Sequence, residues 1–242
     1  MIIPDWPLPK GVHAVTSTRV GGVSTGQYRG LNLGAHVGDD PQHVAENRAV
    51  IKDMAAMPSA PVWLNQTHSS DVVTLSEPMT NVIDADASYT CSAGVVCCVM
   101  TADCLPILLC AQSGKAVAAV HAGWRGLADG IVEKSVALFG EPVTAWIGPA
   151  IGPTAFEVGE EVVRAFVSHH SNAIAAFEPS ESAGKWMGNL SLLAKQRLVD
   201  AGVSETQIVE SGLCTYFDEE TFYSYRRDGQ TGRMASFIWL DK

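Results

Sequence analysis

Two histidines and one cysteine have the chemistry and the placement of metal ligands. His68, Cys104 and His121 lie in the segments NQTHS, TADCLP and HAGWRG, where an apolar run meets a short polar stretch. Catalytic zinc usually takes three protein ligands from imidazole, thiolate and carboxylate groups and leaves a fourth position for water or substrate. A lone histidine or cysteine is more often structural. Together, however, the three residues are a candidate metal site.

Predicted strands position these candidate ligands. The apolar runs PVWL, GVVCCVM and KAVAAV precede His68, Cys104 and His121, respectively. Strand ends that converge at one sheet edge can build a site on a rigid frame. Gly123 and Gly126 are expected to allow a close turn after His121.

Strand and helix patterns are interspersed along the chain, which favours an α/β (α+β mixed) fold. We expect a three-layer sandwich around a mixed β-sheet. No GxGxxG follows a predicted strand and no GxxxxGK[ST] occurs, which disfavours a Rossmann site and excludes a P-loop. Helices are predicted at 40–57, 124–140, 160–169 and 185–201, and strands at 13–20, 61–68, 72–75, 94–100, 106–110, 115–122, 143–149, 206–210, 222–227 and 233–240.

Composition narrows the class of protein. The 242 residues are 47% hydrophobic and 17% charged with no linker-like stretch, so we expect a single domain over 1–242. A net charge of -10 with scattered basic residues disfavours nucleic acid binding. Without a signal-like N-terminus or a long apolar run, we expect no membrane association and a cytoplasmic location. We also expect a monomer or weak homo-oligomer. Cys97, Cys98 and Cys110 are expected to be reduced core residues.

Several long motifs in order resemble one family. NQTHSSDV, TADCLPILL, HAGWRG, IGPAIG and FYSYRRDGQTGR are similar to motifs of the YfiH-like family, also called the multicopper polyphenol oxidase or laccase-domain family and described as purine nucleoside phosphorylases. The resemblance runs from about residue 16 to 233. It implies the YfiH-like fold and zinc on His68, Cys104 and His121. It also implies phosphorolysis of adenosine, inosine, guanosine and S-methyl-5'-thioadenosine, with adenosine deamination in the same pocket.

Phosphorolysis requires a cation that holds the phosphate co-substrate. Arginine matches phosphate oxygens with a planar fork of donors. Arg48 is the first candidate, because the resemblance implies an arginine in this helix; a solvated surface residue is the alternative. Arginines elsewhere are reserves: Arg19, Arg125, Arg226 and Arg227.

Polar and aromatic residues near the ligands are candidates for substrate contacts. Asn65 and Gln66 could bond a purine edge or a ribose hydroxyl, or cap a strand end. Asp103 could orient a ligand imidazole or assist proton transfer, or hold a turn. Trp124 and Tyr225 could stack on a base, or anchor packing. The predicted substrate-binding set is Asn65, Gln66, Trp124, Arg125, Tyr225 and Arg226, and the predicted catalytic set is Arg48, Asp103 and Cys104.

Three other functions remain open. Cys104 could be the nucleophile of a hydrolase with His121 or His68 as its base, and such an enzyme could edit peptidoglycan precursors. Copper could replace zinc, because two histidines, one cysteine and Met100 superficially fit a blue copper site. A multicopper oxidase needs many more imidazoles than this chain offers in clusters. A structural zinc needs a fourth ligand, such as Cys98 or Asp103.

Overall fold

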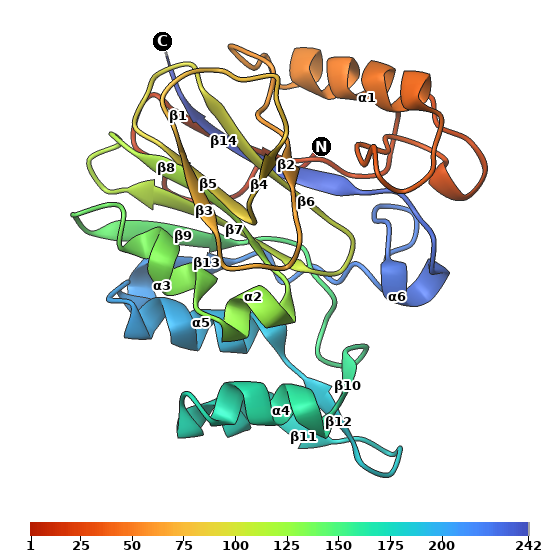
Figure 1. Ribbon diagram of the computed structural model, residues 1–242, viewed down its shortest axis with the longest axis vertical. Helices are drawn as coiled ribbons and strands as arrows, with labels where there is room; N and C mark the ends of the chain where they lie inside the picture. The colour runs from red at the N-terminus through yellow and green to blue at the C-terminus, as the bar shows by residue number, and fades with distance from the viewer. Residues whose placement is uncertain (242) are drawn as a thin grey trace.

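Two β-sheets pack face to face at the centre of the computed structural model, which describes residues 1–241 (Figure 1). The larger sheet is mixed: its outermost strand pairs are parallel and its inner pairs antiparallel. The smaller sheet is antiparallel. The predicted mixed α/β class is confirmed. The strand order is β13 (Ile208–Glu210), β9 (Val143–Ile147), β7 (Leu105–Ala111), β8 (Val117–Ala122), β5 (Ala87–Thr90) and β3 (Val72–Leu75) in the larger sheet, and β1 (Val12–Thr16), β14 (Met234–Leu240) and β6 (Val96–Thr101) in the smaller.

Burial on both faces explains why the central strands are apolar without interruption. In β7, Leu105, Ile107 and Leu109 pack toward the helices, while Leu108 and Cys110 pack toward the smaller sheet. A strand that is covered on both faces has no solvent side for polar residues. In β8 the polar side chain is that of His121, near the end of the strand, which is where the candidate site lies.

Helices cover the outer face of each sheet (Figure 1). Leu127, Ile131 and Leu193 bury helices against the larger sheet, and Ile51 buries α1 (Pro41–Met54) against the smaller one. The predicted start of α1 is confirmed, because the Asp40 carboxylate accepts from a backbone N–H of the first turn at 2.8 Å. The helices on the larger sheet are α2 (Trp124–Ala128), α3 (Ile131–Val136) and α5 (Leu190–Asp200).

A small antiparallel sheet with its own helices extends the fold beyond α5, at the bottom of Figure 1. It consists of β10 (Glu157–Gly159), β12 (Lys185–Gly188) and β11 (Phe177–Pro179), beside α4 (Glu160–Val167) and the 3-10 helix η2 (Ser171–Ala176). No helix within residues 1–241 is long and apolar enough to cross a membrane. The remaining elements are the strands β2 (Leu64–Asn65) and β4 (Ile83–Asp84), the 3-10 helices η1 (Gly26–Tyr28) and η3 (Glu205–Gln207), and α6 (Tyr225–Asp228).

Local capping explains where the predicted helices were wrong. The helix predicted over 124–140 is two helices, because Gly130 between them has a left-handed backbone with φ 91°. The helix predicted over 185–201 starts later: 185–188 is a strand, and the Asn189 side chain then caps α5 by accepting from Leu192 N at 3.0 Å.

Two predicted strands are also largely replaced by other structure. Over 222–227, buried Phe222 and Tyr223 are followed by Ser224, which caps the short helix α6. Over 61–68, only β2 is a strand, and His68 lies in a loop with φ 62°.

Candidate metal centre

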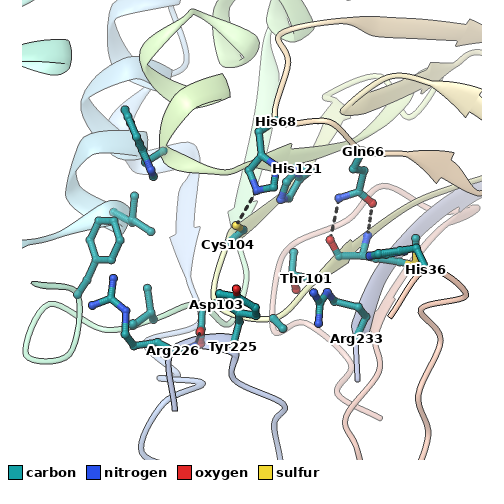
Figure 2. A pocket seen from close by; sticks show the side chains of 16 residues that line it. His36, Gln66, His68, Thr101, Asp103, Cys104, His121, Tyr225, Arg226 and Arg233 are labelled. Carbon is teal, nitrogen blue, oxygen red and sulfur yellow. Dashed lines mark hydrogen bonds between the residues drawn. The ribbon is translucent and has the colours of Figure 1, made fainter. Parts of the chain in front are cut away.

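The structure brings His68, Cys104 and His121 together from three separate segments. Their ligand atoms all lie within 4.8 Å of one another. Nε2 of His68 is 3.7 Å from Sγ of Cys104, and the two imidazole rings meet edge to face at a centroid distance of 4.9 Å (Figure 2). Such a cluster has the donor set of a transition metal site.

His121 is the most deeply fixed member of the cluster. It occupies the end of β8, where it is 3% exposed. Its Nδ1 bonds to the carboxylate of Asp86 at 2.7 Å, and its backbone N–H donates to Asp86 O. A carboxylate on one ring nitrogen fixes the tautomer and leaves the other nitrogen available as a ligand.

The same carboxylate holds the loop of His68. Asp86 accepts from the backbone N–H groups of Thr67, His68 and Ser69 at 2.7–3.1 Å, and from Ser69 Oγ at 2.8 Å. Burial raises the pKa of Asp86, but hydrogen bonds from His121 and Ser69 outweigh burial and lower the pKa to about 2. Asp86 is therefore ionised at neutral pH and links the two histidines.

Cys104 lies on the tight connection between β6 of the smaller sheet and β7 of the larger one. The preceding residue, Asp103, has a left-handed backbone with φ 88°, which permits this turn. Burial raises the pKa of the Cys104 thiol, but His121 and His68 outweigh burial and lower the pKa to about 6. Cys104 can therefore act as a thiolate near neutral pH.

Two glycines give the cluster its space. A Cβ on Gly123 would lie 2.6 Å from Cδ2 of His68, and a Cβ on Gly126 would lie 2.5 Å from the backbone oxygen of Ser69. Both distances are too short for carbon. The spacing HAGWRG therefore allows α2 to pack directly against the His68 loop. The backbone of Gly123 has φ -60°, so close packing rather than the turn requires glycine here.

The cluster fits a three-ligand zinc site. With ordinary zinc bond lengths and a tetrahedral angle, a sulfur and a nitrogen ligand lie about 3.5 Å apart, close to the observed 3.7 Å. Cys98 is buried elsewhere, with its Sγ on the carbonyl oxygen of Val62 at 3.2 Å. Within residues 1–241 the cluster includes no fourth histidine, cysteine or carboxylate. Three protein ligands are typical of a catalytic site rather than a structural one.

A cavity of about 430 Å³ opens beside the cluster. This volume is in the range of small-molecule sites. The apolar lining residues Trp124, Ile151 and Phe156 belong to one hydrophobic cluster, which forms an apolar wall. Arg226 and Arg233 lie on different sides of the cavity (Figure 2). The cavity therefore offers an apolar wall on which a flat ligand group can pack. It also offers a cation that can bind an anionic group.

Comparison with known proteins places the chain in a family. Residues 13–241 match the family model described as multi-copper polyphenol oxidoreductase laccase. The chain belongs to this family. The resemblance inferred from the motifs is thereby confirmed.

Relatives of the family cover the whole chain. "Purine nucleoside phosphorylase YfiH" of Shigella flexneri is 54% identical over 99% of this chain and 98% of its own length. "Purine nucleoside phosphorylase" of Haemophilus influenzae is 49% identical over 99% of each. A crystal structure of a Neisseria meningitidis protein aligns with a TM-score of 0.94 and 46% identity, covering 100% of this chain and 99% of that one. YlmD from Geobacillus stearothermophilus aligns with a TM-score of 0.86 and 33% identity, covering 96% and 93%.

Arg48, the predicted phosphate ligand, is outside the cavity lining. Its Nε and Nη2 donate to the carbonyl oxygen of Leu33 at 3.0 and 2.8 Å, and its guanidinium lies 3.8 Å from the ring centroid of Trp63. Its Nη2 also reaches Sδ of Met100, a lining residue, at 3.9 Å. Arg48 thus lies one layer behind the cavity wall.

The two polar residues before His68 are held by the protein itself. Gln66 lines the cavity, but both ends of its amide are bonded to the backbone of Met100, at 2.8 and 2.7 Å. Asn65 is outside the lining and donates to Asp84 at 2.8 Å. Both contacts are those of residues that secure the strand end.

The predicted aromatic and basic contacts are divided between the cavity and its rim. Trp124, Tyr225 and Arg226 line the cavity, and Tyr225 is 61% exposed at its mouth. Arg125 is outside the lining and covers the Trp124 ring at 4.2 Å. Other reserve arginines are held by carbonyl oxygens: Arg19 by Glu219, and Arg227 by Thr215, Tyr216 and Phe222.

Asp103 has a structural set of partners. Its carboxylate accepts from Thr215 Oγ1 at 2.6 Å, Ser224 Oγ at 3.0 Å and the backbone N–H of Arg226 at 2.7 Å. It therefore fastens α6 to the turn that carries Cys104. The imidazole-orienting role expected for Asp103 is performed by Asp86.

Sequence reasoning missed Asp86, His36 and Arg233, although all three line or support the cavity. Asp86 had a usable signal, since it is a carboxylate directly before a strand that pairs with the strand of His121. His36 and Arg233 had none, because they belong to loops whose proximity depends on the fold.

Proposed function

We propose that this protein is a zinc-dependent purine nucleoside phosphorylase. The observation that carries the proposal is the His68, Cys104 and His121 cluster beside a cavity with an apolar wall. The names of the relatives agree with it. A metal, a flat apolar wall and nearby arginines are what a reaction between a nucleoside and phosphate would use.

Phosphorolysis sets clear demands on the cavity. An oxygen of phosphate bonds to C1' of the ribose, while the bond from C1' to the base nitrogen breaks and leaves its electron pair on the base. A proton then completes the free base, and the other product is a sugar 1-phosphate. The apolar wall of Trp124, Ile151 and Phe156 would hold the base, and a guanidinium would hold the phosphate.

We further propose adenosine, inosine, guanosine and S-methyl-5'-thioadenosine as substrates, and adenosine deamination as a second activity of the same cavity. Zinc held by His68, Cys104 and His121 would supply Lewis acidity and favour water as a nucleophile at neutral pH. Copper could also occupy this donor set, because it binds nitrogen and sulfur ligands tightly. Tyr225 at the mouth would cover the bound nucleoside.

Substitution of a ligand tests this function. Cys104→Ala should reduce both zinc content and phosphorolysis of inosine by at least about a hundredfold, since a ligand and the reacting site are lost together. Cys110→Ala is the matched control, because Cys110 is a buried thiol away from the cavity. Wild-type phosphorolysis by Cys104→Ala would contradict the proposal.

A cysteine hydrolase is the second candidate, and one observation favours it. The Asp86 carboxylate orients His121, and His121 is in position to act as a base for Cys104. The pKa of the Cys104 thiol is lowered. Peptidoglycan precursors would be its substrates. Such an enzyme would keep its activity after chelation and lose it on alkylation, whereas the phosphorylase would lose activity on chelation.

A polyphenol oxidase is less well supported by the donor residues. Multicopper catalysis needs a cluster of several coppers with many imidazoles, and residues 1–241 contain one group of three ligands. The sulfur of Met100 accepts a long hydrogen bond from Nη2 of Arg48, at 3.9 Å. We therefore infer that the laccase description does not extend to oxidase activity in this chain.

The wider context of the activity is also a proposal. We propose that residues 1–242 form one domain that acts as a monomer or weak homo-oligomer on small molecules, without nucleic acid. A reducing cytoplasmic location agrees with Cys97, Cys98 and Cys110 as free buried thiols.

A further inference from the structure

Arg233 is a cavity residue that the metal cluster does not use. It lies just before β14, and its side chain points into the cavity near Thr101 and His36, on the side away from Arg226 (Figure 2). Phe156 of the apolar lining lies on the Arg226 side instead, with its ring centroid 5.7 Å from Cζ of Arg226. The cavity thus has an apolar part and a separate cationic part.

The protein holds Arg233 in place but leaves much of its guanidinium free. Nη1 donates to the carbonyl oxygens of Thr231 and Gly232 at 2.9 and 3.0 Å. The side chain stem lies on Gly34, where a Cβ would be 2.8 Å from Cγ of Arg233. Within residues 1–241, no protein hydrogen bond occupies Nε or Nη2. This edge carries the paired donors that match two oxygens of one anion.

No carboxylate among residues 1–241 lies within ion-pair distance of Arg233 or Arg48. Burial lowers the pKa of Arg233, which reflects incomplete hydration. Burial, followed by the charges of Arg233 and Arg48, lowers the pKa of His36. The negative groups that act on Arg233 do so from a distance: first the Cys104 thiol, which belongs to the metal cluster, and then Asp103, whose carboxylate is bonded to Thr215, Ser224 and Arg226. A half-buried cation without a partner is costly unless a ligand supplies the anion.

We propose that Arg233 and His36 form the subsite for inorganic phosphate, with Arg48 supporting it electrostatically from behind Met100. This inference rests on the proposed phosphorylase function, and it moves the direct phosphate contact from Arg48 to Arg233. The free edge of Arg233 binds two phosphate oxygens, and His36 at the exposed rim donates to a third. The nucleoside then lies between this subsite and the apolar wall.

Titration with inorganic phosphate alone tests the subsite without requiring turnover. The zinc-loaded wild-type protein, Arg233→Gln, Arg233→Lys and His36→Gln are compared by calorimetry. Arg164→Gln is the control, because Arg164 is an exposed arginine of α4 paired with Glu160. Arg233→Gln should weaken phosphate binding about 10- to 100-fold, because charge-assisted hydrogen bonds are lost. Arg233→Lys, with a charge but no fork, should be intermediate.

The variants also report on folding. His36 is exposed, so His36→Gln keeps the test valid if Arg233→Gln does not fold, and it should weaken phosphate binding several-fold. Unchanged phosphate affinity in a folded Arg233→Gln or Arg233→Lys protein, or in His36→Gln, overturns the subsite. The subsite is also overturned if two results occur together: the wild-type protein does not bind phosphate alone, and Arg233→Gln phosphorolyses inosine with an unchanged KM for phosphate.

Two further outcomes separate the subsite from the function. Phosphate binding that depends on Arg233, in a protein without phosphorolysis, supports the subsite and removes the proposed function. Binding of adenosine 5'-monophosphate that depends on Arg233, without binding of inorganic phosphate, assigns the arginine to a nucleotide and overturns the co-substrate role. A raised KM for phosphate in Arg233→Gln with a nearly unchanged KM for inosine supports the full proposal.

Discussion

Asp86 connects two of the three candidate ligands through a single side chain. It bonds to the ring of His121 and to the backbone of the loop that carries His68. The cost of burying this carboxylate is offset by the number of donors around it. The geometry of the cluster therefore depends on a residue that is not one of the three candidate ligands.

Asp86→Asn should weaken zinc affinity about 10- to 100-fold, because the acceptor that orients His121 is replaced by a neutral amide. Zinc competition against a chromogenic chelator measures the affinity. Asp84→Asn is the matched control, since Asp84 lies two residues away and bonds only to Asn65 among the described side chains. Equal affinities of Asp86→Asn and the wild-type protein would show that the linkage has no role in ligand orientation.

The thiol of Cys104 should be reactive in the metal-free protein. Because its pKa is lowered to about 6, the thiolate predominates above that pH and disappears as the pH falls below it. Alkylation by iodoacetamide should therefore reach a plateau above pH 7, and zinc should protect the thiol. Mass spectrometry of the modified peptide follows the rate. A rate that keeps rising tenfold per pH unit up to about pH 8.5, as for an ordinary thiol, would contradict this account.

At the scale of elements, the candidate site lies where the chain passes from the smaller sheet to the larger one. β6 belongs to the smaller sheet and β7 to the larger one, and Cys104 lies on the turn between them. Asp103 fastens α6 to that turn, and α2 packs against the loop of His68 through Gly126. Movement of one of these elements is therefore transmitted directly to a ligand.

Gly126→Ala should displace the His68 loop, because the new Cβ would lie 2.5 Å from the backbone oxygen of Ser69. We expect a loss of about 1–3 kcal/mol in the free energy of unfolding, together with weaker zinc binding. Gly114→Ala serves as a control: it meets Pro9 at 2.8 Å, remote from the cluster, and should reduce stability without changing zinc affinity. Parallel loss of zinc affinity in both variants would indicate a general effect of destabilisation.

Element patterns also show what the sequence could predict. The apolar runs at β6, β7, β8 and β14 identify buried strands because both faces of each are covered. The sequence does not reveal that these strands divide between two sheets, since alternation is invisible when both faces are apolar. The prediction of short elements fails for a different reason. A single cap, such as Ser224 before α6, decides the local structure.

At the scale of the whole molecule, the metal would join distant parts of the chain. His68, Cys104 and His121 come from separate segments, and the unfolded chain does not hold them together. Their convergence could be predicted through the family resemblance but not from spacing alone. The places of His36 and Arg233 could not be predicted, because they arise from contacts between loops that only folding creates. Asp86 differs, since it directly precedes β5, which pairs with the strand of His121.

Zinc should stabilise the folded protein. A ligand present at a thousandfold excess over its Kd adds about 4 kcal/mol to the free energy of unfolding. A chelator should therefore lower the Tm of the wild-type protein clearly, and should leave the Tm of Cys104→Ala almost unchanged. Differential scanning calorimetry with and without zinc decides the matter, and a wild-type Tm that is insensitive to chelation would argue against a resident metal.

The most direct test of the central claim is incubation of the purified protein with adenosine, with and without phosphate and a zinc chelator, followed by chromatographic separation of adenine, inosine and hypoxanthine. The account predicts adenine that appears only with phosphate and inosine that appears without it, both lost on chelation and restored by zinc. Nucleoside turnover that survives complete zinc removal, or the absence of any turnover by the zinc-loaded protein, would contradict it.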